Sequence, residues 1–243
     1  MSDLNQALQD VVVANRILAR EGVLDGFGHV SIRHPDNPGH YFLSCSRAPE
    51  LVRREDLIEY SLQGEPLNQN GRAQYAERAI HGAVYAARPD VMAVSHNHSP
   101  SLIPFGITRT ALRPVLHMGA LAGGDVPLWD IRDDFGDTNL LVIKWEQGQS
   151  LARALGPRRV ALMRGHGSVV ATESLREVVM ASVYLEVNAK LQLQAQSLGA
   201  EINFLTPGEI EQCADMLVKP AYPSLDRAWE YWRARAGCSG LEA

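Results

Sequence analysis

The chain has 243 residues, of which 46% are hydrophobic and 21% charged, a composition typical of a globular protein that buries its core without disulfides. Its net charge is −5 and it has no basic stripe, which argues against nucleic-acid binding. Cys45, Cys213 and Cys238 are odd in number and far apart, so we expect no disulfide framework. With no signal-peptide pattern and no run of roughly 18 apolar residues, we expect a cytoplasmic protein without a membrane partner.

Periodicity and turn residues predict the following elements in chain order: a helix at about 3–20, strands at 29–33, 41–44 and 57–61, a helix at about 73–88, strands at 91–98, 160–163 and 169–171, and helices at about 174–198, from 206, and at about 225–234. Ser174 with Glu177 three positions later has the pattern of a capping box. Strands mixed with flanking helices predict an α/β sandwich around a largely antiparallel sheet. We expect one domain over 1–243 with a C-terminal helical tail from about 206.

The most informative segment is the predicted strand that ends in His96-Asn97-His98. Alternate residues of a strand share a face, so both imidazoles would point the same way and could bind one cation. The alternative is that they are unrelated histidines, one of which caps a helix beginning near Ser99.

His166 lies between Gly165 and Gly167 at a predicted turn after an apolar strand. Glycines on both sides let the backbone approach a neighbour closely and adopt unusual dihedral angles. This pattern favours a metal ligand that arrives from a distant loop.

Glu77 falls on an otherwise apolar face of the predicted helix, in register with Ile80 and Val84. A buried carboxylate needs a partner, and that partner is either a cation or a base such as Arg72 or Arg78. His81, one turn later, is expected to pack or to support the ligands. Three imidazoles and one carboxylate suit zinc, manganese, iron or cobalt.

These residues together resemble the class II aldolase/adducin family over roughly residues 4–205. The resemblance rests on four features in matching order: Gly28-His29-Val30-Ser31-Ile32-Arg33, Glu77 four before His81, His96-Asn97-His98 fifteen beyond His81, and Gly165-His166-Gly167. It implies a three-layer α/β/α sandwich and a divalent ion on His96, His98 and His166. It also implies that Glu77 is an acid/base residue that can double as a ligand, and a homotetramer with active sites between subunits.

The sequence departs from the family's sugar-phosphate aldolases where they bind phosphate. It has His29 in place of Asn, Ser46-Arg47 in place of Thr-Gly, and Tyr75-Ala76 in place of Ser-Ser; Met118 replaces a proton-donating tyrosine. The segments 43–51 and 163–167 are instead similar to the hydroxyaromatic carboxylate decarboxylase branch. That branch includes decarboxylases of dihydroxyphthalate and of a hydroxymethylpyridine dicarboxylate.

The resemblance therefore predicts metal-dependent, non-oxidative decarboxylation of a hydroxylated aromatic mono- or dicarboxylate. Glu77 or His29 would deliver a proton to the ring carbon, and Arg47 would pair with a second carboxylate, with Ser46 and Ser31 as further substrate-binding residues. The alternatives are a surface arginine for Arg47 and a structural hydrogen bond to the turn for His29.

Three other functions stay open from the sequence: an aldolase acting on a small non-phosphorylated hydroxy-carbonyl compound, an iron-dependent oxygenase, and a non-catalytic adducin-like module. The aromatic residues Trp229, Tyr231 and Trp232 of the last predicted helix either fill the core or cover the substrate.

Overall fold

The computed structural model describes residues 3–219 and 221–240, built around a seven-stranded sheet with the order β3-β2-β1-β4-β7-β6-β5. The strands are β1 (His29–Arg33), β2 (His40–Ser44), β3 (Leu57–Ser61), β4 (Ala93–Asn97), β5 (Leu128–Trp129), β6 (Val160–Met163) and β7 (Gly167–Thr172). Neighbouring strands pair antiparallel except β5 and β6, which are parallel. The predicted, largely antiparallel sheet is confirmed.

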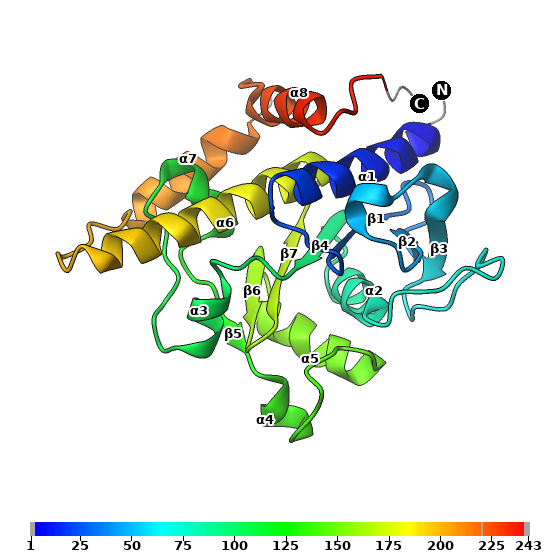
Figure 1. Ribbon diagram of the computed structural model, residues 1–243, viewed down its shortest axis with the longest axis horizontal. Coiled ribbons are helices and arrows are strands. Elements are labelled where there is room, and N and C mark those ends of the chain that lie inside the picture. The colour runs from blue at the N-terminus through cyan, green and yellow to red at the C-terminus, as the bar shows by residue number, and fades with distance from the viewer. Residues whose placement is uncertain (1–2, 220, 241–243) are drawn as a thin grey trace.

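Helices cover both faces of the sheet. They are α1 (Asp3–Arg20), α2 (Arg78–Ala87), α3 (Ile103–Ile107), α4 (Ile131–Phe135), α5 (Trp145–Leu155), α6 (Leu175–Ser197), α7 (Pro207–Val218) and α8 (Ser224–Arg235), with 3-10 turns η1 (Pro49–Leu51), η2 (Arg54–Asp56) and η3 (His117–Ala122). Figure 1 shows α1, α6 and α8 on one side of the sheet and α2 and α5 on the other, which is the predicted α/β/α sandwich. Among the described helices, none is both long and apolar enough to cross a membrane.

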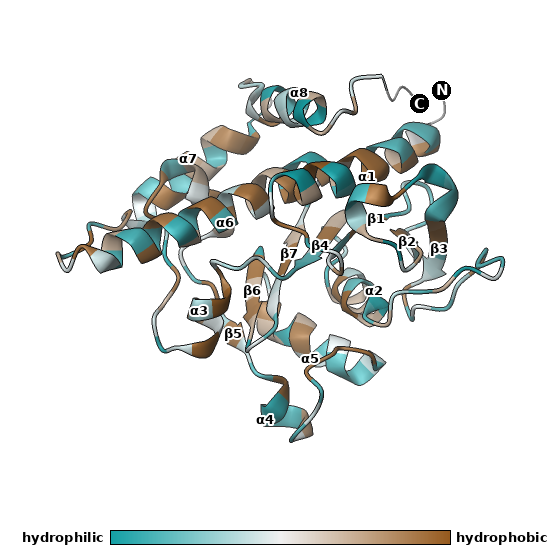
Figure 2. Ribbon diagram, viewed as in Figure 1, coloured by the Kyte–Doolittle hydropathy of each residue, from teal (hydrophilic) through white to brown (hydrophobic). Residues whose placement is uncertain are grey.

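The alternation of side chains along the strands creates two separate hydrophobic cores. Val30 and Ile32 of β1 pack with α1 and α6, whereas Val94 of β4 packs with α2 and α5. Figure 2 shows the corresponding pattern of hydrophobic strands between helices that carry hydrophilic outer stripes. Because His29 and Ser31 alternate with the apolar residues of β1, their side chains face α2.

The start of α2 differs from the prediction. The helix begins at Arg78 rather than near Ala73, and Glu77 is its N-cap residue with φ −92° and ψ 19°. Residues 73 and 74 are held against the end of β2 by two contacts: the Ser46 N–H donates to the Ala73 carbonyl at 2.8 Å, and Cys45 forms a bridge with Gln74. This pairing competes with helix formation.

The structure also gives the outcome of two predictions about the later helices. Ser174 caps α6 by accepting from the Glu177 N–H at 3.2 Å, but the Glu177 carboxylate pairs with Arg159 at 3.1 Å instead of completing the capping box. Trp229 and Trp232 of α8 are buried in the core beside α1 and α6, so within this chain they fill the core.

Candidate functional site

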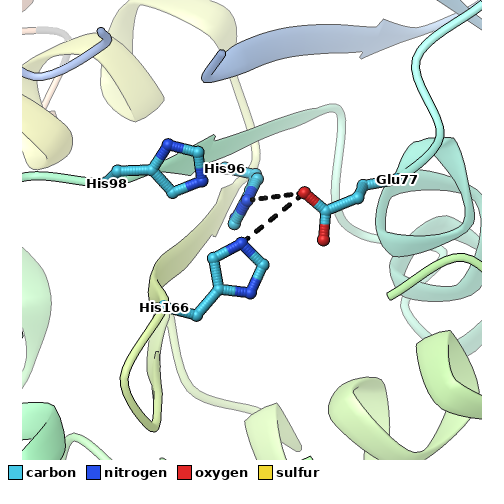
Figure 3. Close-up of side chains that lie close together, drawn as sticks. All are labelled: Glu77, His96, His98 and His166. Carbon is cyan, nitrogen blue, oxygen red and sulfur yellow. Dashed lines mark ion pairs between the residues drawn. The ribbon is translucent and has the colours of Figure 1, made fainter. Parts of the chain in front are cut away.

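Four potential metal ligands from distant parts of the chain meet at one end of β4. They are His96 near the end of that strand, His98 just beyond it, His166 in the turn between β6 and β7, and Glu77 immediately before α2. Each offers one ligand atom, and these atoms all lie within 4.8 Å of one another. Figure 3 shows the Glu77 carboxylate facing the rings of His96 and His166.

The pairing of β4 with β7 brings His166 to the other two histidines. Asn97 lies opposite Ser168 in this pair, so the β6–β7 turn lies against the end of β4. Gly165 has a φ of +62°, and a Cβ on Gly167 would lie 2.0 Å from the Asn97 carbonyl oxygen. The close approach explains why glycines flank His166.

Each imidazole of the cluster is held by its Nδ1 atom, which leaves Nε2 for a ligand. The Nδ1 contacts are His96 to the Ser168 carbonyl at 3.1 Å, His98 to the Asp25 carboxylate at 3.2 Å, and His166 to the Leu140 carbonyl at 3.0 Å. Contacts of this kind orient metal-binding histidines and fix which ring nitrogen carries the proton.

The chemistry of the cluster fits a cation. His96 Nε2 is fully buried and has no hydrogen-bond partner among the described residues, an arrangement that is costly unless something binds there. Glu77 Oε2 lies 3.5 Å from His96 Nε2 and 3.5 Å from His166 Nε2, too long for hydrogen bonds of normal strength. Three imidazole nitrogens and a carboxylate are a donor set for a borderline divalent metal ion.

Glu77 is anionic in this setting. Burial alone would raise the pKa of its carboxyl, but the close contacts with His166 and His96 outweigh burial and hold the pKa well below its usual range. Its other oxygen, Oε1, accepts from the Val142 N–H at 2.9 Å. Glu77 therefore pairs with the histidines, and the alternative partner Arg78 instead donates from Nε to the Gly64 carbonyl at 2.8 Å.

A single loop, residues 137–144 between α4 and α5, contacts two of the four ligands. Its Leu140 carbonyl accepts from His166, its Val142 N–H donates to Glu77, and its Leu141 lines the neighbouring cavity. Leu140 has a φ of +67°, a left-handed conformation that costs energy for a branched side chain.

A cavity of about 340 Å³ opens beside the cluster. It is lined by Gly26, Phe27, His29, Ser46, Arg47, Ala48, Tyr75, Ala76, Glu77, His98 and Leu141. Three larger surface hollows, two of about 540 Å³ and one of about 420 Å³, lie elsewhere and contain none of the predicted site residues. The structure thus places five of the eight predicted site residues around one cavity. His96 and His166 do not line it but belong to the adjoining cluster with Glu77 and His98.

His29 forms part of the cavity wall but is almost fully buried. Its Nδ1 lies 2.6 Å from His81 Nε2, and its ring centroid lies 4.4 Å from that of Tyr75 and 5.2 Å from that of His96. Burial, followed by the nearby charges of His81 and His96, holds the pKa of His29 well below its usual value. The partner of His29 is therefore a second histidine, not the preceding turn.

Arg47 also lines the cavity, and its guanidinium contacts a carboxylate that is not among the lining residues. Its Nη1 lies 3.4 Å from Asp56 Oδ1, and its Nε is buried without a hydrogen-bond partner among the residues the structure describes. Its backbone carbonyl accepts from the Tyr75 hydroxyl. Ser46, the neighbouring predicted residue, is exposed at the same edge.

Ser31 does not line the cavity. It is fully buried, and its Oγ lies 2.6 Å from His81 Nδ1 and 2.8 Å from the Tyr85 hydroxyl. Its position on β1 places it behind His29, so direct contact with a ligand in this cavity does not fit its placement.

Asp25 is a site residue that the sequence analysis missed. Its Oδ1 accepts from the backbone N–H groups of Phe27 and Gly28 at 2.8 and 2.9 Å while the carboxylate contacts His98. The signal was the Asp-Gly-Phe-Gly segment, because an aspartate that begins a glycine-rich turn often accepts from the following N–H groups.

Comparison with known proteins identifies relatives along nearly the whole chain. Residues 9–193 match the family model described as the class II aldolase and adducin N-terminal domain. The chain is 32% identical to the decarboxylase tropJ of Talaromyces stipitatus over 93% of this chain and 92% of that protein. It is 27% identical to the 3,4-dihydroxyphthalate decarboxylase of Arthrobacter keyseri, over 86% of this chain and 87% of that one. A crystal structure of an aldolase II superfamily protein from Pseudomonas syringae superposes with a TM-score of 0.81 at 21% identity, covering 99% of this chain and 96% of that one.

Proposed function

Since this chain belongs to the class II aldolase and adducin family, we propose that it catalyses the metal-dependent, non-oxidative decarboxylation of a hydroxylated aromatic mono- or dicarboxylate. The observation that carries the proposal is the overlap of two sites: Glu77 and His98 belong both to the cation cluster and to a cavity that also contains Arg47. The names of both decarboxylase relatives support loss of CO₂, and the name of the second supports a hydroxylated aromatic dicarboxylate as substrate.

A divalent cation (Zn²⁺, Mn²⁺, Fe²⁺ or Co²⁺) held by His96, His98 and His166, with Glu77 as a further ligand, would supply the Lewis acidity that stabilises a phenolate or enolate. The Nδ1 contacts described above keep the three rings oriented toward that position before anything binds. This preorganisation avoids the cost of ordering the ligands at each turnover.

Loss of CO₂ from an aromatic ring requires an electron-accepting group that can take up the electron pair of the breaking C–C bond. When the ring carbon that bears the carboxylate is protonated, a phenolate ortho or para to it becomes a ketone. The electron pair of the breaking C–C bond then moves toward this ketone oxygen as CO₂ leaves, and the phenolate is restored. The net change is one proton gained for one CO₂ lost, and the proton is delivered by Glu77 or His29 at the cavity wall. Glu77, which is anionic beside the imidazoles, would first take up the proton that the substrate hydroxyl loses on becoming a phenolate.

Arg47 would orient a dicarboxylate by pairing with the carboxylate that is not lost. We expect Arg47→Ala to raise KM for a dicarboxylate by about 10- to 100-fold, the value of one charge-assisted pair, and to change KM for the matching monocarboxylate far less. Steady-state kinetics on the two substrates measures this difference. Arg53→Ala removes an exposed arginine nearby and is the matched control. Equal effects of Arg47→Ala on both substrates would show that the residue binds no carboxylate.

The reaction is tested by metal analysis of anaerobically purified protein, followed by assay of CO₂ release from a panel of hydroxylated aromatic acids. CO₂ release that needs the metal and consumes no oxygen supports the proposal. Release of an aldehyde or pyruvate would indicate an aldolase, and oxygen consumption an oxygenase. Protein that binds no metal would indicate an adducin-like module.

We also propose that the chain, a single domain with a helical C-terminal tail, assembles as a homotetramer with its sites between subunits. Two apolar residues at the cavity support this assembly, because Phe27 is 76% exposed and Leu141 is 38% exposed. Light scattering tests it, and a monomeric mass with full activity would contradict it.

A further inference from the structure

Four buried polar side chains form a hydrogen-bonded file that runs from the cavity wall into the core beneath α2. His29 Nδ1 lies 2.6 Å from His81 Nε2, and His81 Nδ1 lies 2.6 Å from Ser31 Oγ. Ser31 Oγ lies 2.8 Å from the Tyr85 hydroxyl oxygen. His81 and Tyr85 lie four residues apart on one face of α2, opposite the β1 residues His29 and Ser31. We call these four residues the His29 file.

The direction of the hydrogen bonds in the file is set at its inner end. Burial raises the pKa of the Tyr85 hydroxyl, so the phenol keeps its proton. Ser31 Oγ is the side-chain oxygen within hydrogen-bond distance of Tyr85 in the described part of the chain, and it is therefore the acceptor. Since Ser31 has one proton to donate, that proton goes to His81 Nδ1.

The opposite direction would leave a group unpaired. If His81 donated to Ser31 and Ser31 donated to Tyr85, the Tyr85 proton would have no side-chain acceptor in the described residues. A buried hydroxyl without an acceptor is costly, because it has lost its hydrogen bond to water and gained none.

The proton position on His81 then determines the donor and the acceptor in its hydrogen bond with His29. His81 is fully buried and its two ring nitrogens contact Ser31 and His29 rather than a carboxylate, so its ring is neutral and carries one N–H. Because Nδ1 accepts from Ser31, the proton is on Nε2, which donates to His29 Nδ1. A neutral His29 must then carry its own proton on Nε2, the ring nitrogen without a hydrogen-bond partner among the described side chains.

We propose that Tyr85, Ser31 and His81 fix His29 as the Nε2–H tautomer, which makes it a hydrogen-bond donor to an anionic oxygen of the molecule in the cavity. The identity of that oxygen as a substrate phenolate or carboxylate rests on the proposed function; the tautomer does not. A neutral imidazole is a weak acid but a good hydrogen-bond donor, so His29 stabilises negative charge and Glu77 is left as the residue that transfers the proton to the ring carbon. Because Glu77 is anionic beside the imidazoles, it first takes up the proton that the substrate hydroxyl loses on becoming a phenolate. Ser31, His81 and Tyr85 are positioning residues, since they act through His29.

The tautomer can be read directly by magic-angle-spinning ¹⁵N NMR of the zinc-loaded protein carrying ¹⁵N-labelled histidine. The His29 signals are those that disappear in His29→Asn. We expect the protonated nitrogen of His29 to be Nε2 in the wild-type protein and the two tautomers to be mixed in Tyr85→Phe and in Ser31→Ala. A wild-type proton on Nδ1, or an unchanged Nε2–H in both variants, would overturn the proposal.

Kinetics provides the second measurement. We expect Tyr85→Phe and Ser31→Ala to lower kcat about tenfold, as loss of a supporting hydrogen bond typically does, and Ser31→Thr to restore activity because it keeps the hydroxyl. Tyr41→Phe is the matched control: Tyr41 is also buried beside Tyr85, but its hydroxyl donates to the Arg78 carbonyl outside the file. Equal losses in Tyr41→Phe and Tyr85→Phe would overturn the positioning role. If no hydroxyaromatic acid is decarboxylated by the wild type, the proposed function fails while the NMR result still decides the tautomer.

Discussion

The two faces of the central sheet are built from the same strands but contain different kinds of side chain. Beneath α1 and α6 the strands contribute Val30, Ile32 and Val170 to a continuous apolar core. Beneath α2 the alternate positions of β1 and β4 carry His29 and His96. Both faces therefore bury apolar side chains, but only the face beneath α2 and α5 combines its apolar core with this cluster of buried histidines, each of which needs a specific partner. Substitutions on the two faces should therefore have separable effects.

The largest expected effect is on the polar face, for His96→Ala. Removing the most deeply buried imidazole of the cluster should eliminate metal binding and lower kcat/KM by about a thousandfold or more, because Lewis-acid stabilisation contributes several kcal/mol. Metal content and CO₂ release measure the two losses. His117→Ala, at an exposed histidine outside the cluster, is the control. A His96→Ala protein that still binds a full equivalent of metal would contradict the assignment.

Glu77→Gln should separate chemistry from metal binding on the same face. The three imidazoles remain, so much of the metal should stay bound, while turnover should fall by about 10² to 10⁴ because the acid/base group is gone. Glu177→Gln alters another buried glutamate, paired with Arg159, and should leave turnover unchanged. Near-normal turnover in Glu77→Gln would remove Glu77 from the reaction.

The apolar face should respond in the opposite way. Ile17 of α1 is fully buried against this core, and Ile17→Ala should lower the free energy of unfolding by about 2–5 kcal/mol. The kcat of the folded variant should stay close to that of the wild type. Urea denaturation measures the free energy of unfolding, and kinetics at urea concentrations below the unfolding transition measure kcat. A large loss of kcat in fully folded protein would contradict the proposed division between the faces.

The smallest expected effect, taken over a single pH unit, is a dependence of stability on pH that originates on the polar face. The pKa of His81 is lowered to about 3 in the folded protein, so between that pH and about 6.5 the unfolded chain binds a proton that the folded chain does not. The free energy of unfolding should therefore be highest above pH 6.5. It should fall as the pH drops below 6.5, by up to about 1.4 kcal/mol per pH unit for each such histidine. Urea denaturation of metal-free protein at several pH values measures the slope. His81→Gln should reduce the slope, and an unchanged slope would show that His81 is not its source.

Local pattern was enough to predict much of the fold, and the four predicted ligands do lie close together. The predicted strands 29–33, 57–61 and 160–163 agree with the structure, as do the α/β/α architecture and the family. The expectation of an enzyme of the carbon–carbon lyase class is likewise confirmed by the family together with the named decarboxylase relatives. Alternation along a strand and flanking glycines are properties of neighbouring residues, so they can be read from sequence.

Features that depend on long-range pairing could not be read in this way. The start of α2 was misplaced because the bridge between Cys45 and Gln74 overrides local helical periodicity. Helix α5 received no prediction because it buries Gln147, Gly148 and Ser150 alongside its leucines, which obscures an apolar stripe. Ser31 was assigned to the substrate site because the sequence does not show that this face of β1 packs against α2. In the structure that packing places Ser31 behind His29, in contact with His81.

The loop at 137–144 limits how this protein can change its specificity. Leu141 shapes the mouth of the cavity, while its neighbours Leu140 and Val142 anchor His166 and Glu77 through backbone atoms. A shift of this backbone that widened the cavity would also move two of the proposed metal ligands, so altered substrate range and weakened metal affinity should arise together. Directed evolution toward bulkier substrates should therefore favour exchanges of the Leu141 side chain over insertions or deletions in this loop.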